Sequence, residues 1–386
     1  MKPLKDYSFV KGVNHGLERD MDALRRHLGY GKRLGINSVR IWLSYKEYAK
    51  EGEGYVDVLR NFIRTCDSEG VTVMPILFNG NGIDPAILED AFLPEGEKYT
   101  KAIVEGVKNE PGLIMWDVMN EPPCNPLILE APNQEVKDGW YAKIWKFVRH
   151  FCKYVKSLDS ENAMTVGNWL AVDMESSADL VDVLSYHDYS TTLKGVKNAA
   201  KLALSVGEKY GKPVINNETC CIARANPYDQ VIQAMDEMHI PWYVFNLMIE
   251  GYWNDVHGIF YEDGTVRDPA IAAAIVGCFR NRDLNAIVPE KPNREHQAAI
   301  SIQKAAELLA DENKDVFAYG GLNIDALLDV CEEMANLLEC GQLIPMQIPP
   351  TARVAAFRKQ EHVSELEVKK FTFELAKLLK ESCQLL

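Results

Sequence analysis

Two glutamates of this sequence share a setting, because each directly follows an asparagine at the end of an apolar or β-rich run. Glu121 follows Asn120 at the end of the run 113–118, and Glu218 follows Asn217 at the end of the run 214–217. Pro122 cannot continue a strand ladder, so the chain must leave the sheet directly after Glu121. Two carboxyl groups held at strand ends can serve one substrate as a proton donor and a nucleophile.

The segments that must position these glutamates alternate between short apolar runs and amphipathic stretches from residue 7 to about residue 280. The apolar runs predict eight strands, at residues 9–14, 38–43, 71–78, 113–120, 164–167, 183–186, 214–217 and 242–248. The amphipathic stretches predict helices at residues 20–34, 56–69, 98–108, 136–157, 193–210, 228–237 and 269–278, with a short weak one near residue 176.

Eight strand–helix units in about 270 residues match a (β/α)8 TIM barrel, an α/β fold with a usual size of about 250 residues. An open doubly wound sheet is the competing fold, but it normally needs fewer strands. In addition, no glycine-rich phosphate loop follows the first run. In a barrel the carboxyl ends of all strands meet on one face, so the residues that end the runs predict the site. Besides the two glutamates, these ends carry Arg40, His187 and Tyr189, whereas Asp117 lies mid-strand and is expected to be buried and hydrogen-bonded.

The segment WDVMNEP, residues 116–122, is the most specific motif of the chain. It resembles the strand-four motif of the retaining glycoside hydrolases of clan A, nearest in style to family 5, the cellulase and mannanase superfamily. The resembling region covers about residues 7–280. The resemblance implies that Glu121 is the acid/base, that Glu218 is the nucleophile and that Asn120 contacts the sugar 2-hydroxyl.

By the same resemblance Arg40 and Tyr189 position the nucleophile, and His187 lines the sugar subsite. Retaining hydrolysis needs two carboxyl groups about 5–5.5 Å apart that hold different protonation states. Arg40 is expected to keep Glu218 ionised, while burial and the neighbouring negative charge are expected to keep Glu121 protonated. Formation of a glycosyl-enzyme would consume the negative charge of Glu218. The pKa of Glu121 would then fall, which prepares Glu121 to act as a base.

Four further residues are candidate sugar contacts. Asn14 and His15 follow the first predicted strand in the segment VNHG. The family commonly places a tryptophan near the end of strand eight, but here Phe245 and Asn246 occupy that region and Trp242 comes too early. Phe245 or Trp253 is therefore predicted as the aromatic platform, with a core role as the alternative.

The composition changes after Arg282, where a linker with two prolines precedes three helical stretches. We therefore predict a catalytic domain over residues 1–283 and a helical domain over residues 284–386. Apolar residues of the middle stretch, 324–339, recur at helical spacing and form one stripe. This tail is expected to pack or to form a homo-oligomer, with ligand binding as the alternative.

The whole-chain composition excludes several classes of partner. A formal net charge of -14 argues against nucleic acid and against an anionic membrane surface. No uncharged apolar run reaches the length of a membrane span. Nine scattered cysteines without a CxxC pair support no zinc site, and with no export signal in the first residues they predict a cytoplasmic protein.

These observations predict a metal-independent, cofactor-free retaining β-glycosidase that acts on short oligosaccharides or glycosides. Transglycosylation at the same site is an alternative, because an acceptor sugar can replace water in the second step. A non-catalytic carbohydrate-binding barrel is a second alternative. A metal-dependent hydrolase is not supported, since no His-x-His or Asp/His cluster lies at the strand ends.

Overall fold

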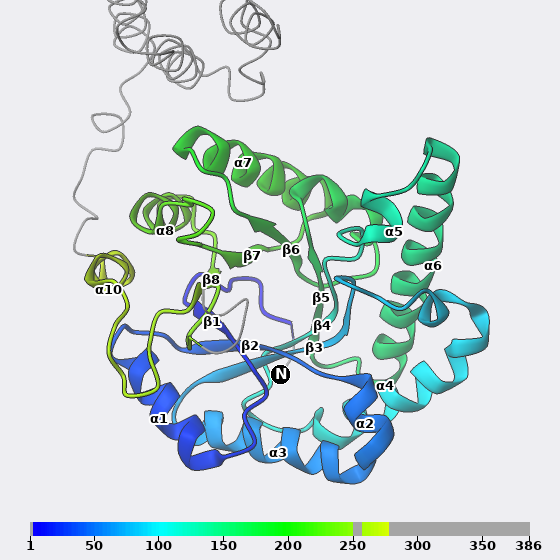
Figure 1. Cartoon of the computed structure of the whole chain (residues 1–386), viewed down its shortest axis with the longest axis horizontal. Helices are drawn as coiled ribbons and strands as arrows, with labels where there is room; N and C mark the ends of the chain where they lie inside the picture. Colours follow the sequence, from blue (N-terminus) through cyan, green and yellow to red (C-terminus); the bar gives the residue numbers. More distant parts are fainter. Residues whose placement is uncertain (1–2, 250–256, 278–386) are drawn as a thin grey trace, which may run out of the picture. The chain divides into compact units, whose positions relative to one another are not determined.

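The structure, a computed structural model, describes residues 3–249 and 257–277 and contains a closed barrel of eight parallel strands in sequential order. Figure 1 shows these strands at the centre of a ring of helices. The strands are β1 (Lys11–His15), β2 (Ser38–Trp42), β3 (Thr72–Asn79), β4 (Met115–Asn120), β5 (Ala163–Asn168), β6 (Leu184–Asp188), β7 (Val214–Thr219) and β8 (Trp242–Val244). β1 pairs with β8 and closes the barrel.

The helices follow the strands and cover the outside of the barrel (Figure 1). The longer ones are α1 (Met21–Lys32), α3 (Glu53–Ser68), α4 (Leu93–Val107), α6 (Gln134–Leu158), α7 (Leu193–Tyr210), α8 (Tyr228–Glu237) and α10 (Pro269–Val276). Shorter elements are α2 (Tyr45–Glu51), α5 (Pro126–Leu129) and the 3-10 turns η1 (Pro85–Leu88), η2 (Asp90–Phe92) and η3 (Ala171–Ser176). Several helices begin at side-chain caps, for example α1 at Asp20 and α7 at Thr192.

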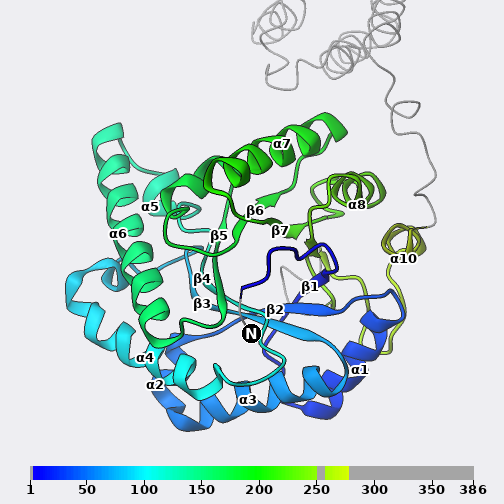
Figure 2. The ribbon, with the colours of Figure 1, turned by 180° about the vertical axis from the view of Figure 1, so that it is seen from behind.

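The first described segment closes one end of the barrel. Tyr7 and Val10 are buried against apolar residues from several strands, among them Met74, Met115 and Tyr243. In Figure 2 this segment, in dark blue, crosses the barrel end. With one end filled by side chains, a ligand must reach the barrel from the opposite end, where the strands finish.

The predicted (β/α)8 barrel is confirmed, and most predicted elements lie within a few residues of the observed ones. The helix α2 was not predicted, and β8 ends at Val244 although the apolar pattern continues to residue 248. The predicted helices of residues 284–386 lie outside the described residues. In the described part of the chain, no helix combines the length and the apolar character needed to span a membrane.

Gly12 on β1 is a position where the barrel interior has no room for a side chain. A Cβ atom there would overlap the ring of Tyr243, which is fully buried and held by a 2.8 Å hydrogen bond between its hydroxyl and Ser38 Oγ. We expect Gly12→Ala to lower the free energy of unfolding by about 1–3 kcal/mol, measured by urea denaturation.

The control variant is Gly29→Ala on the exposed side of α1, where an added Cβ meets nothing within 4 Å. Because alanine favours helix more than glycine, this variant is expected to gain about 0.5–1 kcal/mol. Equal effects of the two substitutions would contradict the packing argument.

Candidate active site

Arg40 on β2 is the centre of the polar network inside the barrel. Its side chain is completely buried and lies 2.9 Å from Asp117 Oδ2 and 3.0 Å from Glu218 Oε2. It also donates to the side-chain oxygens of Asn14, at 3.1 Å, and of Asn120, at 2.7 Å. The guanidinium therefore joins side chains from β1, β4 and β7 to its own strand. Five donors in a rigid fork suit this arrangement, which Lys could not reproduce.

Glu218 on β7 is held by two donors on its two oxygens. Arg40 bonds Oε2, and the Tyr189 hydroxyl donates to Oε1 at 2.8 Å. Burial raises the pKa of Tyr189 well above its usual value, and the nearby Glu218 adds to the rise. Tyr189 therefore stays a hydrogen-bond donor, and together with Arg40 it fixes the direction of the Glu218 carboxylate.

Glu121 leaves β4 in an uncommon backbone conformation, with φ of 45°. Its amide donates to Gly167 O at 2.6 Å, which satisfies the backbone where the strand ends. A Cβ atom on Gly80 would collide with the carbonyl oxygen of Glu121, so the chain that follows β3 can approach this turn only with glycine there. The two prolines that follow are consistent with a chain that turns out of the sheet.

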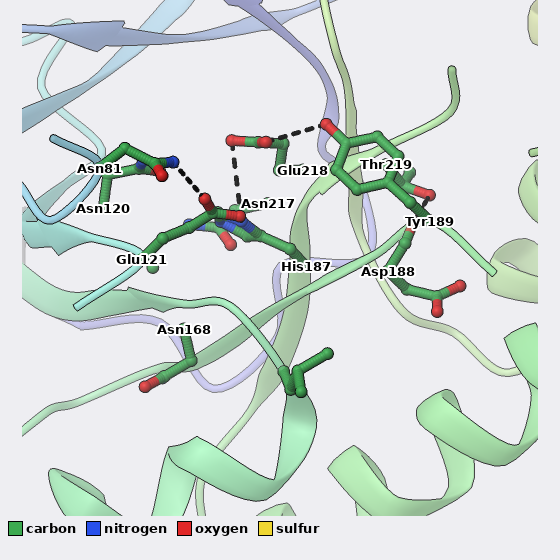
Figure 3. Close-up of polar contacts among 12 residues, drawn as sticks. Asn81, Asn120, Glu121, Asn168, His187, Asp188, Tyr189, Asn217, Glu218 and Thr219 are labelled. Atoms are coloured by element: carbon green, nitrogen blue, oxygen red, sulfur yellow. Dashed lines mark hydrogen bonds and ion pairs between the residues drawn. The ribbon is translucent and has the colours of Figure 1, made fainter. Parts of the chain in front are cut away.

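The side chain of Glu121 is buried and bonded on both oxygens. His187 Nδ1 lies 2.7 Å from Oε1, and the Asn81 amide donates to Oε2. His187 Nδ1 also lies 3.7 Å from Glu218 Oε2. Figure 3 shows the two carboxylates near each other, with Asn81 beside Glu121 and Tyr189 beside Glu218.

One ligand atom from each of Glu121, His187 and Glu218 lies within 4.8 Å of the others. Such a triad could approach a metal ion, but its atoms are already engaged. Arg40 adds a positive charge on Glu218, and the Nδ1 atom that would coordinate a metal instead faces Glu121. A metal ligand histidine must be neutral with a free lone pair. The arrangement therefore fits proton transfer between side chains better than metal binding.

The protonation of Glu121 differs from the prediction. Burial raises the pKa of its carboxyl, but the hydrogen bond and charge of His187, followed by the Asn81 amide and Arg40, outweigh burial. The pKa consequently lies below the usual value for Glu, which is the opposite direction from the one that the sequence predicts. The reason is that His187 faces Glu121, which sequence spacing does not reveal.

His187 should therefore control the pH dependence of any reaction that uses a protonated Glu121. A lowered pKa means that the protonated fraction falls as pH rises through a value below that of ordinary Glu. Replacing His187 by phenylalanine removes the donor, so the pKa of Glu121 rises and the high-pH limb of kcat/KM moves to higher pH. A pH–rate profile measures this shift.

The control for this prediction is His150→Phe, because His150 pairs with Glu97 at 2.8 Å on the outer helices. That variant should keep the wild-type profile. A high-pH limb that stays in place or moves down in His187→Phe would contradict the role given to His187.

Aromatic side chains line one side of the polar network. Trp42 is half-buried, with the Arg40 guanidinium 5.2 Å from its ring centre. Phe245, also half-buried, meets Trp42 edge-on at 5.6 Å and His257 at 4.7 Å. Phe245 thus lies where a sugar platform was predicted, and Trp42 extends the surface. The other candidate, Trp253, lies outside the described residues.

Two predicted sugar contacts have other roles. Asn14 is completely buried, and its amide donates to the carbonyls of Asn217 and Val244 while its oxygen accepts from Arg40. It positions Arg40 and offers no surface to a sugar. His15 faces the helix layer, where Nε2 lies 3.2 Å from His27 Nδ1. Successive strand residues point to opposite faces, so with Asn14 inside the barrel His15 must lie outside. Both predictions of a sugar contact are wrong.

Asn120 and Asp117, the remaining predicted residues, both bond the guanidinium of Arg40. Asn120 accepts from Arg40 and donates to Asn79 Oδ1 at 2.9 Å. Asp117 is buried and hydrogen-bonded, as predicted, and accepts from Arg40, Gly167 N and Asn217. Burial raises the pKa of Asp117, and the Arg40 charge opposes that rise.

Sequence reasoning missed Trp42, Asn81 and Gly167. Trp42 lies two residues after Arg40 on the same strand, so the period of two places both on one face. Asn81 lies in a loop, where no periodicity applies. Gly167 leaves the space that Arg40 fills, since a Cβ there would lie 2.5 Å from Nη2 of that arginine.

The chain spans only part of the curated proteins that it resembles. β-Glucuronidases from Pongo abelii and Homo sapiens are each 24% identical over 218 residues, which is 53% of this chain and 30% of the relative.

Solved structures resemble the barrel at low identity. The endo-β-1,4-mannanase from Thermotoga petrophila gives a TM-score of 0.53 at 17% identity, covering 69% of this chain and 75% of that one. The GH5_18 protein from Streptomyces cattleya, solved in complex with GlcNAc, gives a TM-score of 0.54 at 14% identity, covering 73% and 81%. These likenesses support the same barrel fold. The sequence itself matches the cellulase family over residues 28–251, which include β2 to β8, and the chain therefore belongs to glycosyl hydrolase family 5.

Proposed function

We propose that this protein is a retaining β-glycosidase that hydrolyses short oligosaccharides or glycosides by double displacement. The observation that carries the proposal is the separation of the two carboxyl groups, since an oxygen of Glu121 lies within 4.8 Å of an oxygen of Glu218. Inverting glycosidases hold their carboxyl groups about 6.5–9.5 Å apart to admit a water, whereas retaining ones hold them about 5–5.5 Å apart. Family 5 membership supports the same reaction class.

Glu218 is the proposed nucleophile. Arg40 and Tyr189 each bond one of its two oxygens, and so direct the carboxylate that attacks the anomeric carbon. The attack forms a bond between a Glu218 oxygen and that carbon, and it breaks the bond to the leaving-group oxygen.

Glu121 is the proposed acid/base. It protonates the leaving-group oxygen in the first step and takes a proton from water in the second. His187 holds Glu121 in the charged form before substrate binds. A glycosidic oxygen therefore competes with His187 Nδ1 for Glu121 Oε1, and Glu121 takes up a proton from solvent as that exchange occurs. Asn81 keeps Oε2 in place meanwhile.

The stereochemistry of the first-formed product tests the proposal. Proton NMR of a fresh reaction with an aryl β-glycoside should show the β-anomer of the released sugar first, followed by slow mutarotation. An α-anomer as the first product would overturn the double displacement. Chromatography of products from substrates of increasing length tests the preference for short oligosaccharides, which predicts no gain in kcat/KM beyond the shortest.

A further inference from the structure

Arg224 places a second guanidinium beside the proposed catalytic residues. It follows Glu218 by six positions, in the loop between β7 and α8, and its side chain is exposed. Its Cζ atom lies 4.3 Å from the ring centre of Tyr189, whose hydroxyl bonds Glu218. A cation over an aromatic ring is held there by the ring quadrupole. The Tyr189 ring therefore contacts Arg224 on its face and the proposed nucleophile, Glu218, through its hydroxyl.

The charge of Arg224 also affects the pKa of Cys124, which follows β4 on the Glu121 side of the site. Burial raises the pKa of the half-buried Cys124 thiol to about 12, Glu121 adds to that rise, and Arg224 opposes it. Cys124 comes three residues after Glu121. The guanidinium thus influences a residue that follows β4 as well as contacting Tyr189, which follows β6, and its exposure places it at the rim of the site.

The loop that carries Arg224 is anchored. Asn226 is buried, its side-chain oxygen accepts from Cys220 N at 2.8 Å, and its amide donates to Ser190 O at 2.6 Å. Backbone bonds from Asn226 N to Cys221 O and from Ala225 N to Ile222 O tighten the turn. A loop that is bonded within itself and to the β6–α7 connection presents Arg224 with little ordering cost on ligand binding.

Arg224 differs from Arg40 in the number of carboxylates that lie at ion-pair distance from its guanidinium. Arg40 already lies against two carboxylates, Asp117 and Glu218. Within residues 3–249 and 257–277, Arg224 has no carboxylate at ion-pair distance, so its fork of donors is open to a ligand. A neutral sugar would not need it, whereas carboxylate and phosphate groups match the fork geometry.

We propose that Arg224 binds a negatively charged group, a carboxylate or a phosphate, on the sugar of the substrate, so that the protein prefers acidic glycosides to neutral ones. This inference rests on the proposed glycosidase function and names its substrate class. The negative charges of Glu121 and Glu218 would otherwise repel such a substrate, and Arg224 offsets that repulsion at the rim.

The test compares three nitrophenyl β-glycosides, the glucuronide, the 6-phosphoglucoside and the glucoside, with the full-length protein and Arg224→Gln. We expect kcat/KM of the wild type to favour an acidic glycoside over the glucoside. The loss caused by Arg224→Gln should be larger for the acidic glycoside than for the neutral one by on the order of 10- to 100-fold, mainly through KM. Turnover of the glucuronide would identify a carboxylate as the group that Arg224 binds, and turnover of the 6-phosphoglucoside would identify a phosphate.

The control variant is Arg25→Gln on α1, where Arg25 pairs only with Asp22 in the described structure and lies on the exposed surface. It should match the wild type on all three substrates. Equal losses on acidic and neutral glycosides in Arg224→Gln would show that Arg224 only packs on Tyr189, and would overturn the inference. A wild-type preference for the neutral glycoside would also overturn it.

Calorimetric titration with glucuronate, glucose 6-phosphate and glucose measures binding without turnover. Tighter binding of an acidic sugar that is lost in Arg224→Gln supports the inference, and equal binding of all three contradicts it. If the neutral glycoside is hydrolysed, that activity disappears in Glu218→Ala, and the wild type shows no preference for acidic glycosides, the role of Arg224 is refuted while the proposed glycosidase function stands. Acidic turnover that survives Glu218→Ala would instead refute the proposed nucleophile.

Discussion

Replacing Glu218 by alanine is expected to lower kcat/KM for aryl β-glycosides by about 10⁴-fold or more, because in the proposed mechanism its carboxylate forms the covalent intermediate. Added azide should restore part of the activity by entering the space left by the carboxylate. Because azide then displaces the leaving group in one inversion, the product from a β-glycoside should be the α-glycosyl azide. NMR of the isolated product measures this configuration.

The matched control is Glu208→Ala on the exposed face of α7, which removes a carboxylate of the same type away from the site. It should retain wild-type activity. Undiminished turnover in Glu218→Ala, or a β-glycosyl azide from that variant, would show that another group is the nucleophile. Circular dichroism should accompany the assay, since Glu218 also shares the buried Arg40 network.

Replacing Glu121 by alanine is expected to have an effect that depends on the leaving group. A substrate with a poor leaving group, such as an alkyl glycoside or a disaccharide, needs the proton and should lose about 10²–10⁴-fold in kcat/KM. Dinitrophenolate leaves without being protonated. The first step with a dinitrophenyl glycoside should therefore be nearly unchanged in Glu121→Ala, and the glycosyl-enzyme should accumulate. A burst of released phenol followed by a slow steady rate would record that accumulation.

Azide distinguishes the Glu121 variant from the Glu218 variant. In Glu121→Ala the Glu218 carboxylate still performs the first inversion and azide performs the second, so the product should be the β-glycosyl azide. An equal loss of activity for good and poor leaving groups would contradict the acid/base role. The same result would direct attention to His187, which lies 2.7 Å from Glu121.

The positions of the main site residues could be predicted because barrel topology brings all strand ends to one face. Glu121, His187, Tyr189 and Glu218 end or directly follow their apolar runs, Arg40 lies within its own run, and a parallel closed barrel gathers the carboxyl ends of all strands on one face. The error at His15 could have been avoided with the same rule, since the alternation of side chains along β1 places His15 outside the barrel when Asn14 lies inside it.

Other features depend on departures from regular strands, which apolar periodicity does not encode. The register shifts between Asp117 and Asn120 on β4, and between Asn216 and Thr219 on β7. Such irregularities re-aim side chains. They explain how Asn217 and Glu218, although consecutive, both bond residues of the interior network.

The protonation of Glu121 could not be predicted because it depends on which atoms touch. Burial and a neighbouring carboxylate argue for a raised pKa, and both are inferable from strand ends. The 2.7 Å approach of His187 Nδ1 reverses the direction. A contact between side chains on two non-adjacent strands follows from the three-dimensional arrangement and not from spacing along the chain.

The buried guanidinium of Arg40 also has a consequence for how the chain folds. Its acceptors come from β1, β4 and β7, and a slip of one residue in any of these strands would turn the acceptor to the opposite face. A buried charge that loses a partner costs about 3–5 kcal/mol. Mispaired barrels are therefore penalised at the same atoms that bind Glu218, so correct strand registration and assembly of the proposed active site are acquired together.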